Sequence, residues 1–376
     1  MNKDQFRSLY DFIDKKKGSR IIACCGSGGV GKTTISATIG LQCAISGHKT
    51  LVLTIDPAKR LANSLGITSI KHEEQRIPNE KFAQVGLKPK GELYAMMLDT
   101  KRTFDRLVTR YASESMHENI FKNRYYHHIS TNMTGSHEYI AMEKLYELYH
   151  QNKYDIIVLD TPPSRRALDF LEQPERVTKL LSHSLFFKFF KPYVTAGKWG
   201  LKMLNAIATP ILKVTKQMMG QQMLNDVTNF MHLWDDVLFD GVQQRAFATR
   251  ELLSSPQSLF LAITSPLKAP MQESIFLYNK LKAYNLPFGG FIINRVHRLY
   301  PDIANNEEIE INPSLKEKLI SNFKNFNKLA GSDAESINNL VKKLGNDIEV
   351  RNITYFENDI YDFRGLLKVK NELFAL

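Results

Sequence analysis

The sequence predicts an α/β fold in which a mostly parallel sheet is flanked by helices and carries an inserted helical subdomain. Short apolar segments of strand length alternate with longer helical segments along most of the chain, which is the pattern of β–α–β units. The exception is residues 168–253, where we find no convincing strand. We therefore expect a single domain over residues 1–376, with a helical insertion at about 172–255.

The amino-terminal elements predict one strand–helix–strand unit. After a short helix in about the first 15 residues, residues 20–25 (RIIACC) form an apolar run typical of a buried parallel strand. Residues 32–46 have a helical pattern, and Gly47 stands where a C-cap glycine belongs. Residues 50–55 (TLVLTI) then predict the second strand, so the crossover between the two strands should be right-handed.

Further apolar segments predict more strands, with helical stretches between them. They are residues 93–98, 155–159, 259–264 and 291–294. Ligands bind at the carboxyl edge of such parallel sheets. Polar residues that directly follow these strands are therefore the first candidates for a functional site.

A glycine-rich loop joins the first strand to the following helix. Residues 26–33 (GSGGVGKT) fit the pattern G-x-x-x-x-G-K-[ST] in the strand–loop–helix context that this motif requires. Glycines let backbone N–H groups turn toward phosphates, and the helix N-terminus adds a partial positive charge. We expect Lys32 to reach the β- and γ-phosphates and the Thr33 hydroxyl to bind Mg²⁺. The expected nucleotide-binding residues are Gly28, Gly29, Val30, Gly31, Lys32, Thr33 and Thr34.

Two acidic residues end strands close to this loop. Residues 154–160 (YDIIVLD) end in Asp160, as a Walker B strand does, and Asp160 would hold Mg²⁺ through water. Asp56 follows the second strand and is suited to orient or deprotonate an attacking water. Each acid could instead be an ordinary helix cap.

Together these motifs resemble the ArsA-type ATPases, which include the arsenite-pump ATPase and the eukaryotic ATPase that targets tail-anchored membrane proteins. The resemblance rests on the loop GSGGVGKTT, on TIDPA at 54–58 and on DTPPS at 160–164. Residues 135–148 (GSHEYIAMEKLYEL) add to the resemblance. The sequences of these motifs are most similar to those of bacterial anion-transporting ATPase-like proteins. The likeness runs from about residue 21 to the C-terminus and is weakest at about 180–255.

The resemblance implies a P-loop NTPase fold and a nucleotide-dependent dimer with two switch segments. Asp56 falls in switch I as the water-positioning acid, and Asp160 opens switch II. Asn294, within IINR, matches the asparagine that reads adenine, although a simple strand-end turn residue would look the same. Residues 354–366 resemble the stretch that closes over the base.

One position departs from the family pattern. The family usually carries a lysine just after the first glycine of the loop, and that lysine crosses the dimer to the partner's phosphates; here the residue is Ser27. A homodimer would therefore lack this cation in both sites. A surrogate could come from Arg165 and Arg166 or from Lys59 and Arg60, a lysine-bearing paralogue could pair with this chain, or hydrolysis could be slow. We favour the paralogue, because it explains an intact Asp56 beside the missing lysine.

The cysteines argue against two metal-dependent members of the family. The arsenite-pump members bind the metalloid through cysteines, and the eukaryotic targeting members join their dimer through a zinc-holding CxxC. Here Cys24, Cys25 and Cys43 form no CxxC pair, and we expect buried core thiols. We expect neither zinc nor an iron–sulfur cluster, and arsenite pumping is disfavoured.

Most of the net charge of +11 lies in one segment. Residues 176–225 hold eight Lys or Arg and no Asp or Glu, together with many aromatic residues and methionines. Three interpretations stay open: a helical lid with solvated lysines, an adaptable groove for a hydrophobic client, or a helix lying on an anionic membrane surface. The apolar character of the segment disfavours a nucleic-acid partner.

The leading functional hypothesis is therefore an ATPase switch that uses Mg²⁺ and ATP to move a helical region. The alternative is an ATP-binding scaffold or regulatory subunit with little turnover, and a DNA-partitioning ATPase is less favoured. The amino-terminal residues have no apolar core of a signal peptide, and no run of 18 apolar residues occurs. We expect a cytoplasmic protein that could associate peripherally with the membrane.

Overall fold

The computed structural model forms two compact units. The first comprises Met1–Met97, Gln151–Leu168 and Leu252–Leu376, and the second comprises Leu98–His150 and Asp169–Glu251. The structure describes residues 9–14, 18–55, 60–67, 70, 72–111, 114–123, 126–127, 130, 136–163, 239–300, 312–345 and 348–375.

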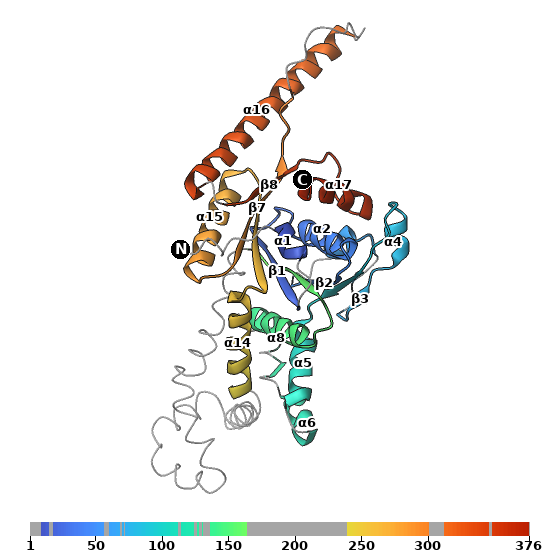
Figure 1. Ribbon diagram of the computed structural model, residues 1–376, viewed down its shortest axis with the longest axis vertical. Helices are drawn as coiled ribbons and strands as arrows, with labels where there is room; N and C mark the ends of the chain where they lie inside the picture. The colour runs from blue at the N-terminus through green and yellow to red at the C-terminus, as the bar shows by residue number, and fades with distance from the viewer. Residues whose placement is uncertain are drawn as a thin grey trace, which may run out of the picture. The chain divides into compact units, whose positions relative to one another are not determined.

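The first unit is built on a twisted sheet whose strands are almost all parallel (Figure 1). In spatial order the strands run β3-β4-β2-β5-β1-β6-β7-β8, and only the β3–β4 pair is antiparallel. Strands β1 and β2 flank β5, so their carboxyl ends meet at one place on the sheet edge. The strands are β1 (Arg20–Gly26), β2 (Lys49–Thr54), β3 (Gln75–Arg76), β4 (Glu92–Met97), β5 (Ile156–Asp160), β6 (Ser258–Thr264), β7 (Phe288–Val296) and β8 (Val350–Thr354).

Every strand expected from an apolar run is present, and the α/β fold class is confirmed. The central strands β1, β5 and β6 are buried along their whole length, which is why their sequences are continuous apolar runs. The pattern missed β3, which has two residues, and β8, whose sequence VRNIT is half polar. An edge strand is covered on fewer sides, so it does not need an apolar run.

Helices cover the sheet of the first unit. Helix α2 (Lys32–Ile45) packs on β1, β2, β4 and β5, and α17 (Phe363–Leu373) packs against α2. Both helices share one apolar core with Ile22 and Cys24 of β1. The remaining helices of this unit are α1 (Leu9–Asp14), α3 (Arg60–Ser64), α4 (Asn79–Ala83), α15 (Lys268–Ala283) and α16 (Pro313–Leu344).

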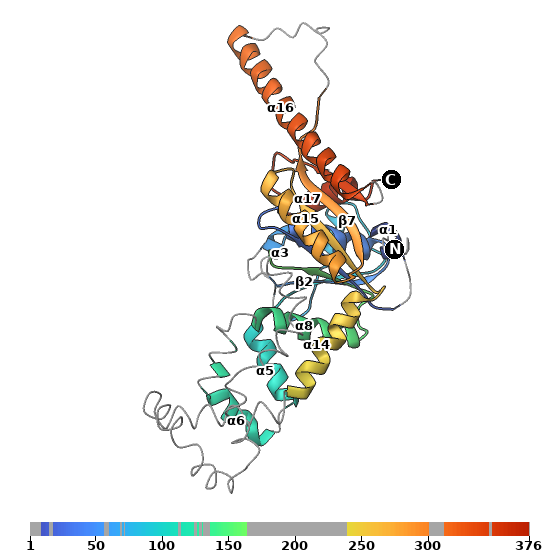
Figure 2. The ribbon, with the colours of Figure 1, turned by 90° about the vertical axis from the view of Figure 1, so that its left-hand side faces the viewer.

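Helix α16 is the longest described helix of the chain, with 32 residues. Its N-terminal half extends away from the sheet of the first unit (Figure 2). Asn312 caps it by accepting a hydrogen bond from the Ser314 amide at 3.0 Å, and Pro313 follows at the first helical position. Its C-terminal half is tied to the sheet because Asp333 accepts hydrogen bonds from the backbone N–H and from Nδ1 of His297.

The described part of the second unit consists of helices. They are α5 (Thr100–Tyr111), α6 (Glu114–Lys122), α8 (Ser136–His150) and α14 (Phe239–Ser254). A buried ion pair joins two of them, since Arg245 Nε of α14 lies 2.7 Å from Glu143 Oε2 of α8. The guanidinium of Arg245 also stacks over the Tyr111 ring at 4.2 Å.

The expected helical insertion is only partly covered by the structure. Residues 239–254 are helical, as α14, whereas the cationic segment 176–225 lies outside the described residues. The prediction of one domain with an insertion at about 172–255 therefore stays a prediction. Within the ranges that the structure describes, no helix is both long enough and apolar enough to cross a membrane.

Candidate nucleotide-binding site

The glycine-rich loop lies between β1 and α2, at the carboxyl edge of the sheet. Gly26 ends β1 so close to β6 that a Cβ there would lie 2.0 Å from the carbonyl oxygen of Ile263. Gly29 and Gly31 have φ values of 78° and 95°, a left-handed backbone conformation that residues other than glycine rarely adopt. The glycines of the motif are therefore required by backbone shape and by close packing.

Helix α2 begins directly after Gly31 and presents its N-terminus to the loop. No side chain caps the helix, so its first amides are available to an anion. The Lys32 ammonium donates a hydrogen bond to the Ser27 carbonyl at 2.8 Å. Lys32 therefore folds back over its own loop, where the phosphates of a nucleotide would offer the ammonium a negatively charged partner in place of a neutral carbonyl.

Ser27 stands where the family lysine would be. It is buried, with 8% of its surface exposed, and in the described part of the chain its Oγ has no hydrogen-bond partner. Ser27 therefore helps to position Lys32 by accepting a hydrogen bond at its backbone carbonyl, and its side chain carries no charge.

Asp160 is the centre of a second cluster, beside the loop. Its Oδ2 accepts hydrogen bonds from Thr33 Oγ1 at 2.8 Å and from Thr54 Oγ1 at 2.9 Å, and only 1% of the residue is exposed. The three residues come from β5, α2 and β2. A hydroxyl and a carboxylate in contact are the oxygen donors that Mg²⁺ prefers, so Thr33 and Asp160 fit the metal site expected of them.

The ends of β2 and β5 are locked to each other and to β1. The Ile55 amide donates to the Asp160 carbonyl at 3.1 Å, and Thr161 Oγ1 donates to the Cys24 carbonyl at 2.8 Å. Asp56 follows Ile55 directly, but it lies outside the described residues, as do Lys59, Arg165 and Arg166. The structure therefore places the metal-site candidates and leaves the roles of Asp56 and of these cations as predictions.

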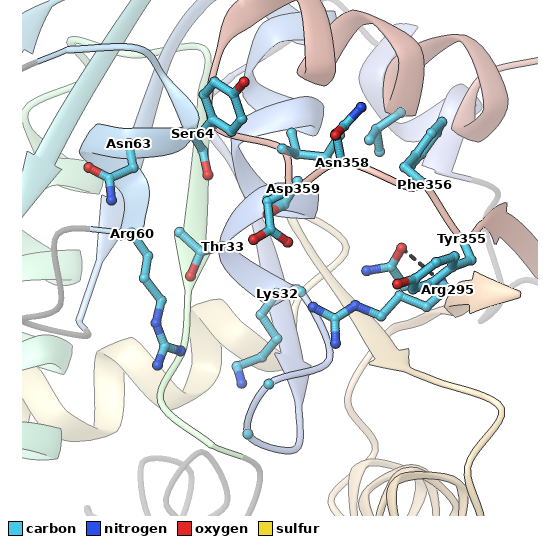
Figure 3. A pocket seen from close by; sticks show the side chains of 18 of the residues that line it. Lys32, Thr33, Arg60, Asn63, Ser64, Arg295, Tyr355, Phe356, Asn358 and Asp359 are labelled. Atoms are coloured by element: carbon cyan, nitrogen blue, oxygen red, sulfur yellow. Dashed lines mark hydrogen bonds between the residues drawn. The ribbon is translucent and has the colours of Figure 1, made fainter.

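A cavity of about 670 Å³ opens over the loop and along the sheet edge (Figure 3). It is lined by phosphate-loop residues, namely Gly28, Gly29, Gly31, Lys32, Thr33 and Thr34. Asn294 and Arg295 of β7 and residues 354–361 also line it. Arg60 and Asn63 of α3 line it as well. Its volume is within the range of small-molecule sites.

Two residues that were predicted to bind the nucleotide have structural contacts of their own. Val30 is buried and does not line the cavity; its carbonyl accepts a hydrogen bond from Asn294 Nδ2 at 2.9 Å. Asn294 does line the cavity, and it also clamps the end of β7 to the phosphate loop. Its amide has a second N–H and a further lone pair, so the prediction that it reads adenine stays open.

Sequence reasoning named the segment 354–366 but no residue in it. The structure shows that Tyr355, Phe356, Asn358 and Asp359 line the cavity from the loop between β8 and α17. Arg295 was also missed, although it follows Asn294 directly. Its position next to Asn294 was the one feature of the sequence that could have indicated it, because the local sequence does not determine the direction of an exposed arginine side chain.

The three cysteines are buried core thiols, as predicted. Cys24 and Cys43 are fully buried and Cys25 is 3% exposed. Burial raises the pKa of Cys25 to about 11, and it also raises the pKa of Cys24 and of Cys43. Neutral, inaccessible thiols of this kind are poor metal ligands and poor nucleophiles.

Comparison with known proteins agrees with the resemblance seen in the motifs. The model of the anion-transporting ATPase family matches residues 19–330. Putative arsenical pump-driving ATPase 1 of Aquifex aeolicus is 28% identical over 300 residues, which cover 74% of this chain and 63% of that relative. Putative arsenical pump-driving ATPase 2 of the same organism is 23% identical over 82% of this chain and 89% of the relative.

A eukaryotic relative matches over a similar length. ATPase ASNA1 homolog 2 of Paramecium tetraurelia is 24% identical over 281 residues, which cover 74% of this chain and 75% of the relative. The family match includes the phosphate loop, the Asp160 cluster and Asn294. The resemblance inferred from the loop and the strand-end motifs is therefore confirmed.

Proposed function

This chain belongs to the anion-transporting ATPase family, and we propose that it works as a molecular switch in which ATP binding closes a dimer and hydrolysis reopens it. The family consists of ATPases, so the expected enzyme class is confirmed. The observation that supports the proposal most directly is the hydrogen-bonded pair Thr33–Asp160 beside the phosphate loop. This pair joins the nucleotide site to the start of switch II.

Binding would begin with an exchange of partners at Lys32. The ammonium, which lies 2.8 Å from the Ser27 carbonyl, would leave that carbonyl for the β- and γ-phosphates. The amides at the start of α2 cradle the phosphates, and Gly29 and Gly31 supply the backbone shape. A bound Mg²⁺ would neutralise charge on the β- and γ-phosphate oxygens. Thr33 and Asp160 are the residues that would hold it.

Hydrolysis would proceed by in-line attack of one water on the γ-phosphorus. As the new P–O bond forms, the bond from that phosphorus to the oxygen bridging the β- and γ-phosphates breaks, which releases ADP and inorganic phosphate. Asp56 would orient the water and take its proton, which then passes to the phosphate product. Asp56 follows Ile55, whose amide is bound to the Asp160 carbonyl, so the acid and the metal-site carboxylate belong to neighbouring strand ends.

This mechanism still requires a cation that stabilises the transition state in addition to Lys32, because Ser27 replaces the lysine that supplies it in the family. We propose that a lysine-bearing paralogue supplies it across the dimer, because Ser27 has no charge. Among the surrogates considered from the sequence, Arg60 lines the cavity together with Lys32 and Thr33. Such a cation can be worth about 10³–10⁵ in rate.

The client of the switch is left open between two chemistries. The segment 176–225 combines eight cationic residues with aromatic side chains and methionines, which suits a hydrophobic client segment or an anionic membrane surface. Flotation with vesicles of neutral or anionic lipid, with and without ATP, separates the two. Flotation only with anionic lipid supports the membrane surface, and no flotation with either lipid leaves the protein client and the helical lid with solvated lysines.

A scaffold that binds ATP without turnover is the second candidate, and the uncharged Ser27 is the observation that favours it. Single-turnover hydrolysis by the purified protein tests the switch, with the Lys32→Ala variant as the negative control. The Asp56→Asn variant should bind ATP normally and lose turnover. If that variant supports full function in cells, turnover is incidental and the switch is wrong.

A further inference from the structure

We infer that Arg295 is a nucleotide-binding residue whose guanidinium covers one face of the base, and that the fold holds Arg295 in a strained conformation for this purpose. The inference deepens the proposed function and rests on its nucleotide site. Arg295 lies near the end of β7, two residues after the last fully buried residue of the strand, and it follows Asn294 directly. The family match does not assign it a role.

The backbone of Arg295 is strained. Its φ is 66°, a left-handed value that a side chain with a Cβ rarely adopts. Among the residues that the structure describes, three non-glycine residues have positive φ, and the other two, Asn152 and Asn285, are of the type that tolerates it best. An arginine in this conformation is therefore an outlier, and such outliers cluster at ligand sites.

Two neighbouring features hold the strained conformation in place. The register between β7 and β8 shifts between Ile293 and Val296, so a bulge occurs at Asn294 and Arg295. The Arg295 amide donates to Asn294 Oδ1 at 3.0 Å, while Asn294 Nδ2 donates to the Val30 carbonyl at 2.9 Å. The direction of Arg295 is thus fixed by a clamp that ends on the phosphate loop itself.

The consequence of this geometry is a cation in the cavity. Arg295 lines the cavity together with Asn294 and residues 354–361, and Figure 3 shows its side chain extending into the cavity. Within the described parts of the chain, the guanidinium makes no hydrogen bond or ion pair. A planar cation that is exposed and has no protein partner can stack on a flat aromatic ligand.

The base is a better partner than the phosphates for reasons of position. Backbone amides, Lys32 and Thr33 already surround the phosphate end of the cavity. Arg295 comes from β7 and the exposed Tyr355 follows β8, whereas the phosphate loop follows β1, and β6 lies between β1 and β7 in the sheet. A base between the guanidinium and the loop of Tyr355 would be covered on both faces.

The test measures ATP, ADP and AMP affinities of the full-length protein by calorimetry for wild type and for Arg295→Ala, Arg295→Gly, Arg295→Asn and Arg295→Lys. The Arg351→Ala variant is the matched control, since Arg351 is an exposed arginine of β8 outside this cavity. We expect Arg295→Ala, Arg295→Gly and Arg295→Asn to weaken all three ligands by a similar factor, about tenfold. Arg295→Lys should recover little, because lysine has no planar group.

The melting temperature of the nucleotide-free protein gives an independent readout of the strain. Glycine and asparagine accept a φ of 66°, so Arg295→Gly and Arg295→Asn should melt above Arg295→Ala even though all three bind more weakly. If Arg295 served only its own fold, affinity would follow stability, and Arg295→Gly and Arg295→Asn would bind the three nucleotides more tightly than Arg295→Ala.

Each remaining outcome counts against a specific statement. Unchanged affinity in the Arg295 variants, with wild type binding ATP, overturns the role of Arg295 and leaves the proposed function standing. A loss that grows from AMP to ATP makes Arg295 a phosphate ligand and overturns its contact with the base. No ATP binding by wild type overturns the proposed function, and this inference with it.

Discussion

The side chain of Asn294 occupies the space that a Cβ at position 31 would need: an alanine Cβ built on Gly31 would lie 2.3 Å from Asn294 Nδ2. The two residues are far apart in the sequence and come from β7 and from the phosphate loop. Their contact means that the loop cannot be shaped independently of the far end of the sheet.

The Gly31→Ala variant should lose stability and nucleotide binding together. The φ of 95° disfavours any Cβ, and the clash with Asn294 adds to it, for a total of about 1–3 kcal/mol in the free energy of unfolding. Urea unfolding measures the loss. Adding Asn294→Ala to Gly31→Ala should remove the clash but not the strain, so the two effects should be less than additive. Full additivity would show that the two side chains do not interfere.

The two hydroxyls bound to Asp160 should differ in function although their hydrogen bonds are alike. Thr33→Val should raise the Mg²⁺ concentration that ATPase activity requires and lower the rate about 100-fold or more, because Thr33 is a candidate metal ligand. Thr54→Val removes the bond from Thr54 to the carboxylate but no candidate metal ligand, and it should cost about 1 kcal/mol of stability. Thr33→Ser is the conservative control and should keep its metal dependence. Equal rate losses for both valine variants would argue against a metal role for Thr33.

Alkaline pH should destabilise the protein through Cys25. Burial raises the pKa of this thiol from 9.0 to about 11, so the folded state favours the neutral form. Stability from this group is fully present below pH 9.0 and falls as pH rises toward about 11. The Cys25→Ala variant should lose less stability than wild type across this window, as measured by urea unfolding at each pH. Thiol labelling of native protein at pH 8 should be slow at Cys25, and fast labelling would contradict its burial.

The Glu143–Arg245 pair should be important for the stability of the second unit. Both side chains are nearly buried, so Arg245→Ala removes the partner of a buried carboxylate and should cost about 3–5 kcal/mol. The exposed pair Glu118–Lys122 is the matched control, and Lys122→Ala should change stability by less than about 0.5 kcal/mol. Hydrogen exchange in α8 and α14 would report the difference. Equal effects of the two substitutions would mean that burial does not decide the strength of the pair.

Prediction from sequence worked best where one local pattern carries the whole signal. Strands β1, β5 and β6 are apolar because both of their faces are buried. The residues of the phosphate loop form one contiguous sequence motif. Strand β8 gave no signal, and residues 354–361 were expected at the site only through the family resemblance, with no single residue named. Their residues are partly exposed and polar, and their place is set by pairing with β7 rather than by their own composition.

The sequence by itself determined the fold class, the family, the phosphate loop with Lys32 and Thr33, and the burial of the three thiols. Each of these depends on residues that are adjacent along the chain or on one short apolar run. Only the tertiary structure decided that Asn294 holds the loop through Val30, that Thr54 shares Asp160 with Thr33, and that Arg295 points into the cavity. These contacts join strands distant in sequence. Their geometry is set by sheet order and register, which no local pattern encodes.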